Sequence, residues 1–94
     1  MTERVYTNSI SKVEIRNDRF IAMIFEGTCQ TGLFQQAFEN ALHLTRLFGI
    51  NRWLADKRNL KNINSYHQQW VLTDWYPRAL EVVSEMSLAD TRKV

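Results

Sequence analysis

A β-hairpin that runs straight into an amphipathic helix is the feature that most limits how this chain can fold. Apolar and charged residues alternate over 13–16, a pattern typical of a strand with one face in water. Asn17 and Asp18 form a favourable turn pair, because both side chains bond nearby backbone and tolerate left-handed dihedrals. The apolar run 20–25 predicts a more deeply buried return strand. Residues 13–26 are therefore expected to form a hairpin.

The next segment shows the three- and four-residue spacing of an amphipathic helix that ends before Gly49. The residues that repeat at this spacing are Phe34, Ala37, Phe38, Ala41, Leu42, Thr45 and Phe48. Thr28 or Thr31 is the predicted N-cap, whose hydroxyl would accept a hydrogen bond from a first-turn amide. Gly49 is the predicted C-cap, since glycine readily adopts the left-handed conformation common at helix ends.

Three further candidate strands and one loop complete the prediction for the sheet. Residues 5–10 indicate a short first strand, and the apolar segment 50–56 is expected to return beside the hairpin. Residues 57–64 are polar and predict a loop. The segment 86–89 either adds one short strand or frays.

The second helix is predicted to begin with a capping box, in which Ser65 and Gln68 satisfy each other's exposed amides. Its predicted buried face draws on Leu72, Trp75, Tyr76, Ala79, Leu80 and Val83. Pro77 lacks an amide hydrogen, so a kink or break is expected just before it. The predicted fold is a single α/β domain over 1–94, with a small mixed sheet in the order β-β-β-α-β-α and an optional closing strand.

Composition excludes several function classes. With twelve basic and ten acidic residues, the net charge of +2 is too small to indicate a nucleic-acid or anionic-membrane partner for the whole surface. Charge gathers only locally, since 46–61 holds five basic residues and one acidic residue. Nucleic acid is therefore not an expected partner.

Cys29 is the only cysteine, so an internal disulfide is excluded and a reducing compartment is favoured. The N-terminus lacks the pattern of a signal peptide, and the longest apolar run, 20–25, is far shorter than the roughly 20 residues of a membrane-spanning helix. The expected location is the cytoplasm. No metal-ligand spacing and no phosphate-binding glycine loop occur in the sequence, so neither a metal nor a cofactor is predicted.

Three short motifs give the chain a resemblance to a known family. They are Trp53-Leu54-Ala55-Asp56-Lys57-Arg58-Asn59, then Gln68-Gln69-Trp70, then Asp74-Trp75-Tyr76-Pro77-Arg78. Together with the hairpin and Gly27 they resemble small bacterial STAS-like (SpoIIAA-like) proteins, over roughly residues 4–83. The resemblance implies a STAS-like α/β fold and a regulatory or protein-interaction role without catalysis. Relatives of this type also include proteins that bind small anionic or lipid-like ligands.

The chain departs from that family pattern in two ways. Such proteins usually continue past the second helix into another strand and further helices, whereas this sequence stops at Val94. A C-terminally shortened member would leave a sheet edge or a helix face for a partner, so a homodimer or a complex with another protein is expected. Antagonist members of the wider STAS group carry a phosphorylatable serine just after a strand, but 55–59 holds neither serine nor threonine. A phosphorylation switch is therefore not expected there.

The candidate ligand site is the cluster of Asp56, Lys57, Arg58 and Asn59, which is expected to follow the end of a strand. Ligands of open α/β sheets bind beyond the carboxyl ends of strands, near helix N-termini that favour anions. Arg58 would clamp a carboxylate or phosphate bidentately, with Asn59 and the amides after Ser65 assisting. The alternative interpretation is structural, namely that Asp56 and Arg58 form an ion pair.

His67 and Trp70 are two further candidates. His67 would assist the anion site or, with Asp56, act as a general base in a small enzyme; the alternative is a solvated histidine on a first helical turn. Trp70 falls about 200° away from Leu72 on a helix, so it is a candidate interface residue if Leu72 faces the core. The sequence thus predicts a non-catalytic interaction module, with a ligand-binding domain and an enzyme that uses Asp56 and His67 as the alternatives.

Overall fold

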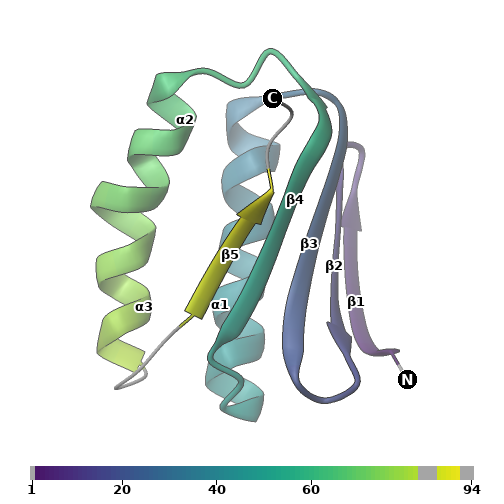
Figure 1. Ribbon diagram of the computed structural model, residues 1–94, viewed down its shortest axis with the longest axis vertical. Helices are drawn as coiled ribbons and strands as arrows, with labels where there is room; N and C mark the ends of the chain where they lie inside the picture. Colours follow the sequence, from purple (N-terminus) through teal and green to yellow (C-terminus); the bar gives the residue numbers. More distant parts are fainter. Residues whose placement is uncertain (1, 83–86, 92–94) are drawn as a thin grey trace.

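The computed structural model describes residues 2–82 and 87–91, which form a five-stranded mixed sheet with helices packed against it (Figure 1). In chain order the elements are β1 (Thr2–Asn8), β2 (Ser11–Arg16), β3 (Phe20–Thr28), α1 (Thr31–Phe48), β4 (Arg52–Lys61), α2 (Ser65–Trp70), the π-helical turn η1 (Val71–Trp75), α3 (Tyr76–Val82) and β5 (Ser87–Thr91). The strands lie in the order β1-β2-β3-β4-β5. β1, β2 and β3 pair antiparallel, whereas β4 is parallel to both β3 and β5. The general class agrees with the prediction of a small α/β fold with a mixed sheet.

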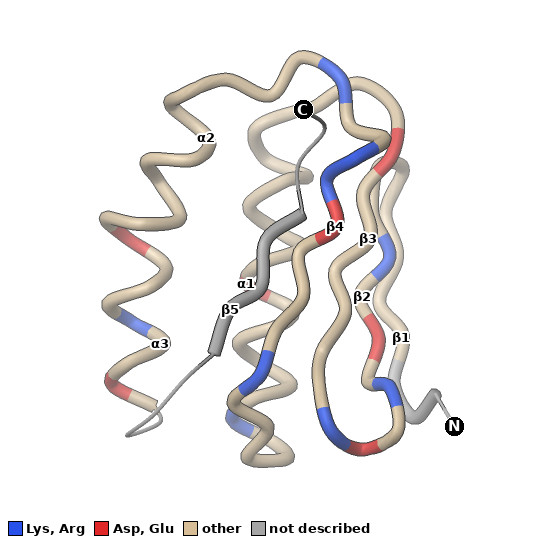
Figure 2. Tube along the Cα trace, in the orientation of Figure 1, with Lys and Arg blue, Asp and Glu red and all other residues tan. Residues whose placement is uncertain are grey.

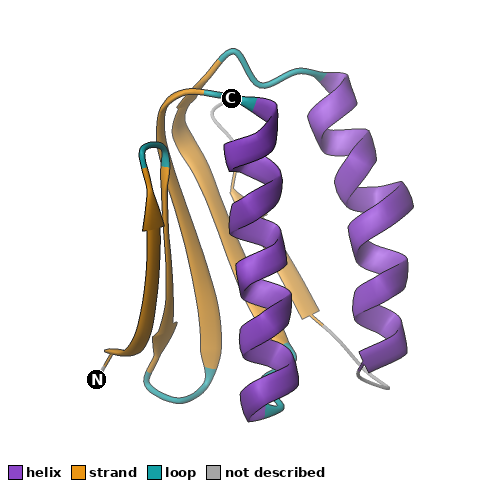
Figure 3. Cartoon of the chain, turned by 180° about the vertical axis from the view of Figure 1, so that it is seen from behind, coloured by secondary structure: helices purple, strands orange, loops and turns teal. Residues whose placement is uncertain are grey.

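The molecule has two layers. α1 and the continuous helical stretch α2–η1–α3 lie on one face of the sheet, as Figure 3 shows from the helical side. In the part of the chain that the structure describes, no helix covers the opposite face, which we call the open face (Figure 1). Since side chains alternate along a strand, the open face carries Val5, Thr7, Lys12, Glu14, Arg16, Phe20, Ala22, Ile24, Glu26, Leu54 and Asp56.

The hairpin and the end of the first helix form where the sequence predicts them. Asn17 and Asp18 both have positive φ, 54° and 53°, and join β2 to β3. Gly49 ends α1 with a φ of 71°, and its amide donates to the carbonyl of Thr45. These left-handed positions therefore fall on residue types that tolerate them.

The start of α1 differs from the prediction that Thr28 or Thr31 caps it. Gln30 is the N-cap and makes no side-chain capping hydrogen bond. Thr28 is the last residue of β3, and Thr31 is the first helical residue. The Thr31 hydroxyl lies 3.0 Å from Nε2 of His67. The Thr31 side chain thus connects α1 to α2 instead of capping its own helix.

β4 continues to Lys61, so the predicted loop over 57–64 is wrong for most of its length. The pairing with β3 shifts by one residue after Asp56, which gives β4 a β-bulge. Arg58 and Asn59 are both exposed at the bulge, where strict alternation would bury one of them. A polar run can therefore belong to a strand here, because the bulge turns two consecutive side chains outward.

The second helical stretch begins with a capping box one residue earlier than predicted. Asn64 rather than Ser65 is the N-cap, and its partner is His67 rather than Gln68. The Asn64 side chain accepts from the His67 amide at 3.3 Å, and Nδ1 of His67 accepts from the Asn64 amide at 3.2 Å. The imidazole of His67 therefore accepts the hydrogen bond from the N-cap amide, which the prediction assigned to the side chain of Gln68.

A π-helical turn lies where Pro77 predicts a kink. The Tyr76 amide donates to the carbonyl of Val71, five residues back. Because the Pro77 ring has no amide hydrogen, the α-helical bond from Pro77 to the carbonyl of Thr73 cannot form. The turn places one extra residue just before the proline and changes which side chains face the sheet.

The buried face of this stretch consequently differs from the prediction. Its buried residues are His67, Val71, Trp75 and Ala79. Leu72 and Leu80, which were expected in the core, are 65% and 48% exposed. Tyr76 is half-buried against the core, and Val83 lies outside the described residues.

The first and the optional last strand are both present. β1 covers Thr2–Asn8, three residues ahead of the predicted start. β5 covers Ser87–Thr91 and runs parallel to β4. Met86, the first residue of the predicted last segment, lies outside the described residues.

Aromatic rings form the centre of the core between the helices and the sheet. The rings in successive contact, with centroids 5.2–6.0 Å apart, belong to Phe25, Phe34, Phe38, Trp53 and Trp75. The Trp75 indole donates to the carbonyl of Phe38 at 2.7 Å, and the Trp53 indole donates to the hydroxyl of Thr45 at 3.1 Å. Within residues 5–82, every buried side-chain nitrogen and oxygen has a hydrogen-bond partner.

Candidate functional site

Asp56 and Arg58 form an ion pair at the bulge of β4. Nε and Nη2 of Arg58 donate to the two carboxylate oxygens at 3.0 and 2.8 Å, and the Arg58 amide donates to Oδ1 at 3.2 Å. These hydrogen bonds and the negative charge of Asp56 raise the pKa of Arg58. The geometry favours the structural interpretation of this pair. The prediction that the cluster follows the end of a strand is wrong, since both residues lie inside β4.

Lys57 and His67 lie on the helical side of the sheet, away from the open face. Their side chains belong to residues that are only 6% and 5% exposed. Lys57 alternates with Asp56 along β4, and the His67 ring packs edge-on against Phe34 of the core. The structure therefore does not bring Asp56 and His67 together as a general-base pair. The alternative of a solvated His67 is also wrong.

The hydrogen bonds of His67 fix its tautomer. Nδ1 accepts from the Asn64 amide at 3.2 Å, so this nitrogen carries no hydrogen. The neutral ring then holds its hydrogen on Nε2, which donates to the Thr31 hydroxyl at 3.0 Å. Both ring nitrogens are used by the fold, which makes His67 a structural link between α1 and α2.

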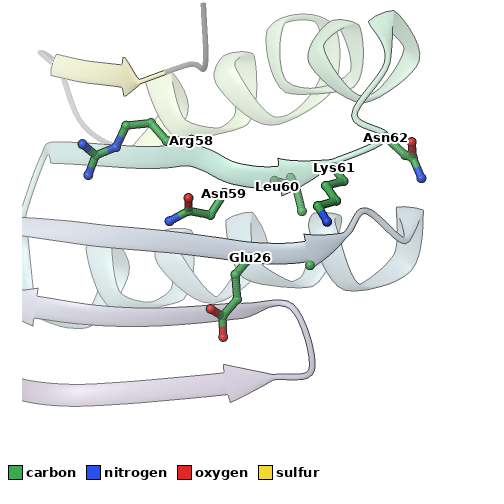
Figure 4. Close-up of a pocket in the computed structure, with 7 residues that line it drawn as sticks. Glu26, Arg58, Asn59, Leu60, Lys61 and Asn62 are labelled. Atoms are coloured by element: carbon green, nitrogen blue, oxygen red, sulfur yellow. The ribbon is translucent and has the colours of Figure 1, made fainter.

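A groove of about 610 Å³ lies on the open side of the sheet, at the carboxyl ends of β3 and β4 (Figure 4). Its lining residues are Glu26, Gly27, Arg58, Asn59, Leu60, Lys61 and Asn62. Of the five predicted ligand residues, Arg58 and Asn59 line this groove. Asp56, Lys57 and His67 are not among its lining residues. The structure thus divides the predicted cluster between an ion pair, the buried side and the groove.

Sequence reasoning missed Glu26, Lys61 and Asn62 as groove residues. The predicted loop gave no reason to place the end of β4 beside β3, whereas the parallel pairing sets Glu26 opposite Asn59. One signal was available in Gly27, which ends the predicted hairpin. Its φ of 84° lies in the left-handed region, and as a glycine it leaves the backbone of β3 bare.

Lys12, Glu14 and Arg16 form a charged row on the open face, and Figure 2 shows basic and acidic positions alternating along β2. Nε and Nη2 of Arg16 lie 2.7 Å from one carboxylate oxygen of Glu14, and Nζ of Lys12 lies 3.4 Å from the other. Burial alone would raise the pKa of Glu14. Hydrogen bonds and positive charge from Arg16 and Lys12 outweigh that effect and hold the pKa below its usual value.

Trp70, the predicted interface residue, is half-buried and packs edge-on against Phe38, with ring centroids 6.1 Å apart. The condition for its interface role was a core-facing Leu72, and that condition is not met. Tyr66 and Leu72 are the large apolar side chains that α2 and η1 expose. An interface role for Trp70 stays a prediction.

Cys29 is half-buried between β3 and α1. Burial raises the pKa of its thiol, while the positive charge of Lys57 acts in the opposite direction. A thiol with a raised pKa is mostly protonated at neutral pH, so this cysteine is a poor nucleophile.

Neither a metal cluster nor a spanning helix occurs among residues 2–82 and 87–91. No three histidine, cysteine or acidic side chains of this part lie together as metal ligands. No helix in it is long and apolar enough to cross a membrane.

Comparison with known protein families, with curated proteins and with solved structures finds no match for this chain. The resemblance to STAS-like proteins therefore rests on the three motifs of the sequence, and the role that it implies is a proposal.

Proposed function

We propose that this chain is a non-catalytic regulatory module of the STAS-like type, which binds another protein or a second copy of itself through the open face. The observation that carries the proposal is the one-sided packing of the helices, which leaves one face of a mixed sheet available to a partner (Figures 1 and 3). On that face Val5 is exposed and Phe20, Ile24 and Leu54 are half-buried. Apolar surface that stays accessible in this way favours docking.

The open face has an apolar centre with charged neighbours. The strand pairing sets Ala22 of β3 beside Leu54 of β4. Ala22 is fully buried by its neighbours, and Leu54 is half-buried. In the adjoining row Ile24 lies between Lys12 and Asp56. Protein interfaces share this composition, since their centres are depleted of charge and their rims are polar.

The test compares Leu54→Glu on the open face with Leu72→Glu on the exposed side of the helical stretch. Native mass spectrometry at low and at moderate salt reports the subunit number and any retained molecule for each protein. We expect the Leu54→Glu variant to lose the partner and the Leu72→Glu variant to keep it, because a charge at an interface centre is desolvated without a counterion. Thermal unfolding midpoints show whether both variants fold.

Two outcomes contradict the proposal. One is a wild-type protein that is strictly monomeric and retains no partner. The other is equal retention by Leu54→Glu and Leu72→Glu, which places the contact outside the open face.

The groove favours a second candidate function, the binding of a small anionic or lipid-like ligand. Arg58 and Lys61 line it together with the amides of Asn59 and Asn62. Its volume lies within the range of about 300–1,000 Å³ that is common for ligand pockets. Arg58→Ala is expected to weaken the binding of inorganic phosphate or acetate in a calorimetric titration, and an unchanged affinity removes Arg58 from this role.

A further inference from the structure

Two opposite charges line the groove without pairing. Glu26 extends from β3, and Lys61 extends from the last position of β4. Neither side chain forms an ion pair within the part of the chain that the structure describes. Figure 4 shows the Glu26 carboxylate turned toward β2, away from Lys61. Of the groove residues that the structure describes, Glu26 and Lys61 are therefore an anion and a cation without an ion pair.

The neighbouring charged residues of the sheet already form ion pairs with one another. Arg58, the other cation of the groove, holds the carboxylate of Asp56 with two side-chain hydrogen bonds. Glu14 is held by Arg16 in the adjoining strand. Among the described residues that line the groove, Lys61 is consequently the cation that can bind an anionic group without first giving up an ion pair, and Glu26 is the anion that can bind a cationic group in the same way.

The floor between these two charges is bare. Gly27 lines the groove and has no side chain, and a Cβ atom built on it would meet no atom within 4 Å. The side-chain amides of Asn59 and Asn62 make no hydrogen bond within residues 5–82. The groove thus combines the side-chain-free position of Gly27 with two side-chain amides whose donors and acceptors are available to a ligand.

We infer that this groove binds a short zwitterion, whose anionic group contacts Lys61 and Asn59 and whose cationic group contacts Glu26. The aliphatic middle of the ligand lies over Gly27. An ω-amino acid has this chemistry, and so does a polypeptide segment with one lysine and one glutamate side chain. The inference goes beyond the open-face proposal, since Leu54 and the apolar centre of that face do not line the groove. It rests on the second candidate function, whose groove it shares, and names the class of ligand.

The experiment is a titration of ¹⁵N-labelled protein followed by backbone amide shifts. The zwitterionic probes are glycine, γ-aminobutyrate, ε-aminocaproate and the capped dipeptide acetyl-lysyl-glutamyl-amide; the singly charged probes are acetate and ethylammonium. We expect shifts in 26–28 and 59–62 with the longer zwitterions. Each singly charged probe should bind about two- to fivefold more weakly, which is the effect of losing one exposed ion pair.

The variants assign each end of the ligand. Lys61→Met should weaken zwitterion binding by the same factor and leave ethylammonium binding unchanged. Glu26→Gln should weaken it equally and leave acetate binding unchanged. Arg46→Gln, which removes an exposed cation at the far end of α1, is the matched control and should change nothing. The amide shifts outside the groove report whether each variant keeps its fold.

Several results overturn the inference. They are the absence of shifts with every probe, shifts confined to another part of the chain, equal affinity for singly charged probes and zwitterions, or full affinity in both groove variants. Tighter binding of the dipeptide than of ε-aminocaproate supports a polypeptide as the source of the zwitterion, and the reverse supports a free amino acid. The Leu54→Glu variant should retain zwitterion binding, so a failure of the open-face proposal and a failure of this inference are distinguishable.

Discussion

Glu14 shows how a single carboxylate becomes buried on a face that no helix covers. Its side chain is 5% exposed, while those of Lys12 and Arg16, two positions away on either side, are 52% and 41% exposed. Residues two apart on a strand share a face, so the two long cations reach over the shorter carboxylate between them. Burial of the carboxylate raises its pKa, whereas the hydrogen bonds and charges of Arg16 and Lys12 lower it. The second effect is the larger, so the pKa of Glu14 is lowered.

The lowered pKa of Glu14 makes part of the stability depend on pH. The folded state holds this carboxylate ionised more strongly than the unfolded state does, so the unfolded state binds more protons as the pH falls. The contribution is therefore present above the pKa of an unfolded glutamate and is lost as the pH falls through the lower, folded pKa. Glu14→Gln should cost about 1 kcal/mol at neutral pH and progressively less below about pH 4. Urea unfolding at a series of pH values measures the difference.

The matched control for this prediction is Glu26→Gln. Glu26 lies on the same face and forms no ion pair within the described residues, so its removal should change the free energy of unfolding by less than about 0.5 kcal/mol. A Glu14→Gln difference that does not shrink in acid would show that the carboxylate charge is not the origin of the effect.

Single residues were also the least predictable part of the molecule. The sequence indicated a polar helix start, but not that Asn64 and His67 would form the capping box in place of Ser65 and Gln68. Two competing caps differ by one position, and the choice depends on a tertiary contact, the bond from His67 to the Thr31 hydroxyl. Local spacing contains no information about that contact.

At the scale of elements, regular patterns were predictable and their interruptions were not. The hairpin and α1 follow from unbroken periods of two and of three to four residues, and their left-handed ends fall on Asn17, Asp18 and Gly49. β4 and the second helical stretch contain a bulge and a π turn, each of which shifts the period by one residue. The candidate ligand cluster was placed at the end of a strand for this reason, although it lies within one.

Two glycines of α1 provide a test of what the helix requires from its ends. A Cβ atom would meet open space at both Gly32 and Gly49, so packing does not distinguish them. Gly49 has a φ of 71°, whereas Gly32 lies in the first turn of the helix. Gly49→Ala should destabilise the protein by about 1 kcal/mol because the left-handed conformation is strained for alanine. Gly32→Ala should instead stabilise it by up to about 1 kcal/mol, since alanine restricts the unfolded chain and favours helix.

Thermal or urea unfolding of the two variants measures both effects under the same conditions. The opposite signs are the essential result. A stabilising Gly49→Ala would mean that the end of α1 does not need its left-handed cap, and the register of the turn into β4 would have to be set by other contacts.

At the scale of the whole molecule, the sequence was sufficient for the α/β class because that class follows from the types of the elements. It was insufficient for the groove, which depends on which strands become neighbours. β3 and β4 are joined through α1, so the residues of the groove come from segments more than thirty positions apart. Only the parallel pairing sets Glu26 beside Asn59, and a spacing argument along one segment cannot supply it.

The arrangement of the strands predicts how amide exchange is distributed. β3 pairs on both sides and lies under the aromatic core, whereas β1 pairs only with β2 in the described sheet. The amides of β3 should therefore exchange only through global unfolding, and the outward amides of β1 at least about a hundredfold faster, through local fraying. Hydrogen exchange followed by NMR at two protein concentrations measures both.

The concentration dependence separates two ways in which the molecule can self-associate. A partner on the open face leaves the outward amides of β1 accessible, because side chains and not backbone groups make that contact. A second copy that adds its own strand to the edge would protect these amides, and the protection would rise with concentration. Fast exchange of the β1 edge in a dimeric sample therefore agrees with an interface on the face. Slow, concentration-dependent exchange would move the interface to the edge, and Leu54→Glu would then leave the dimer intact.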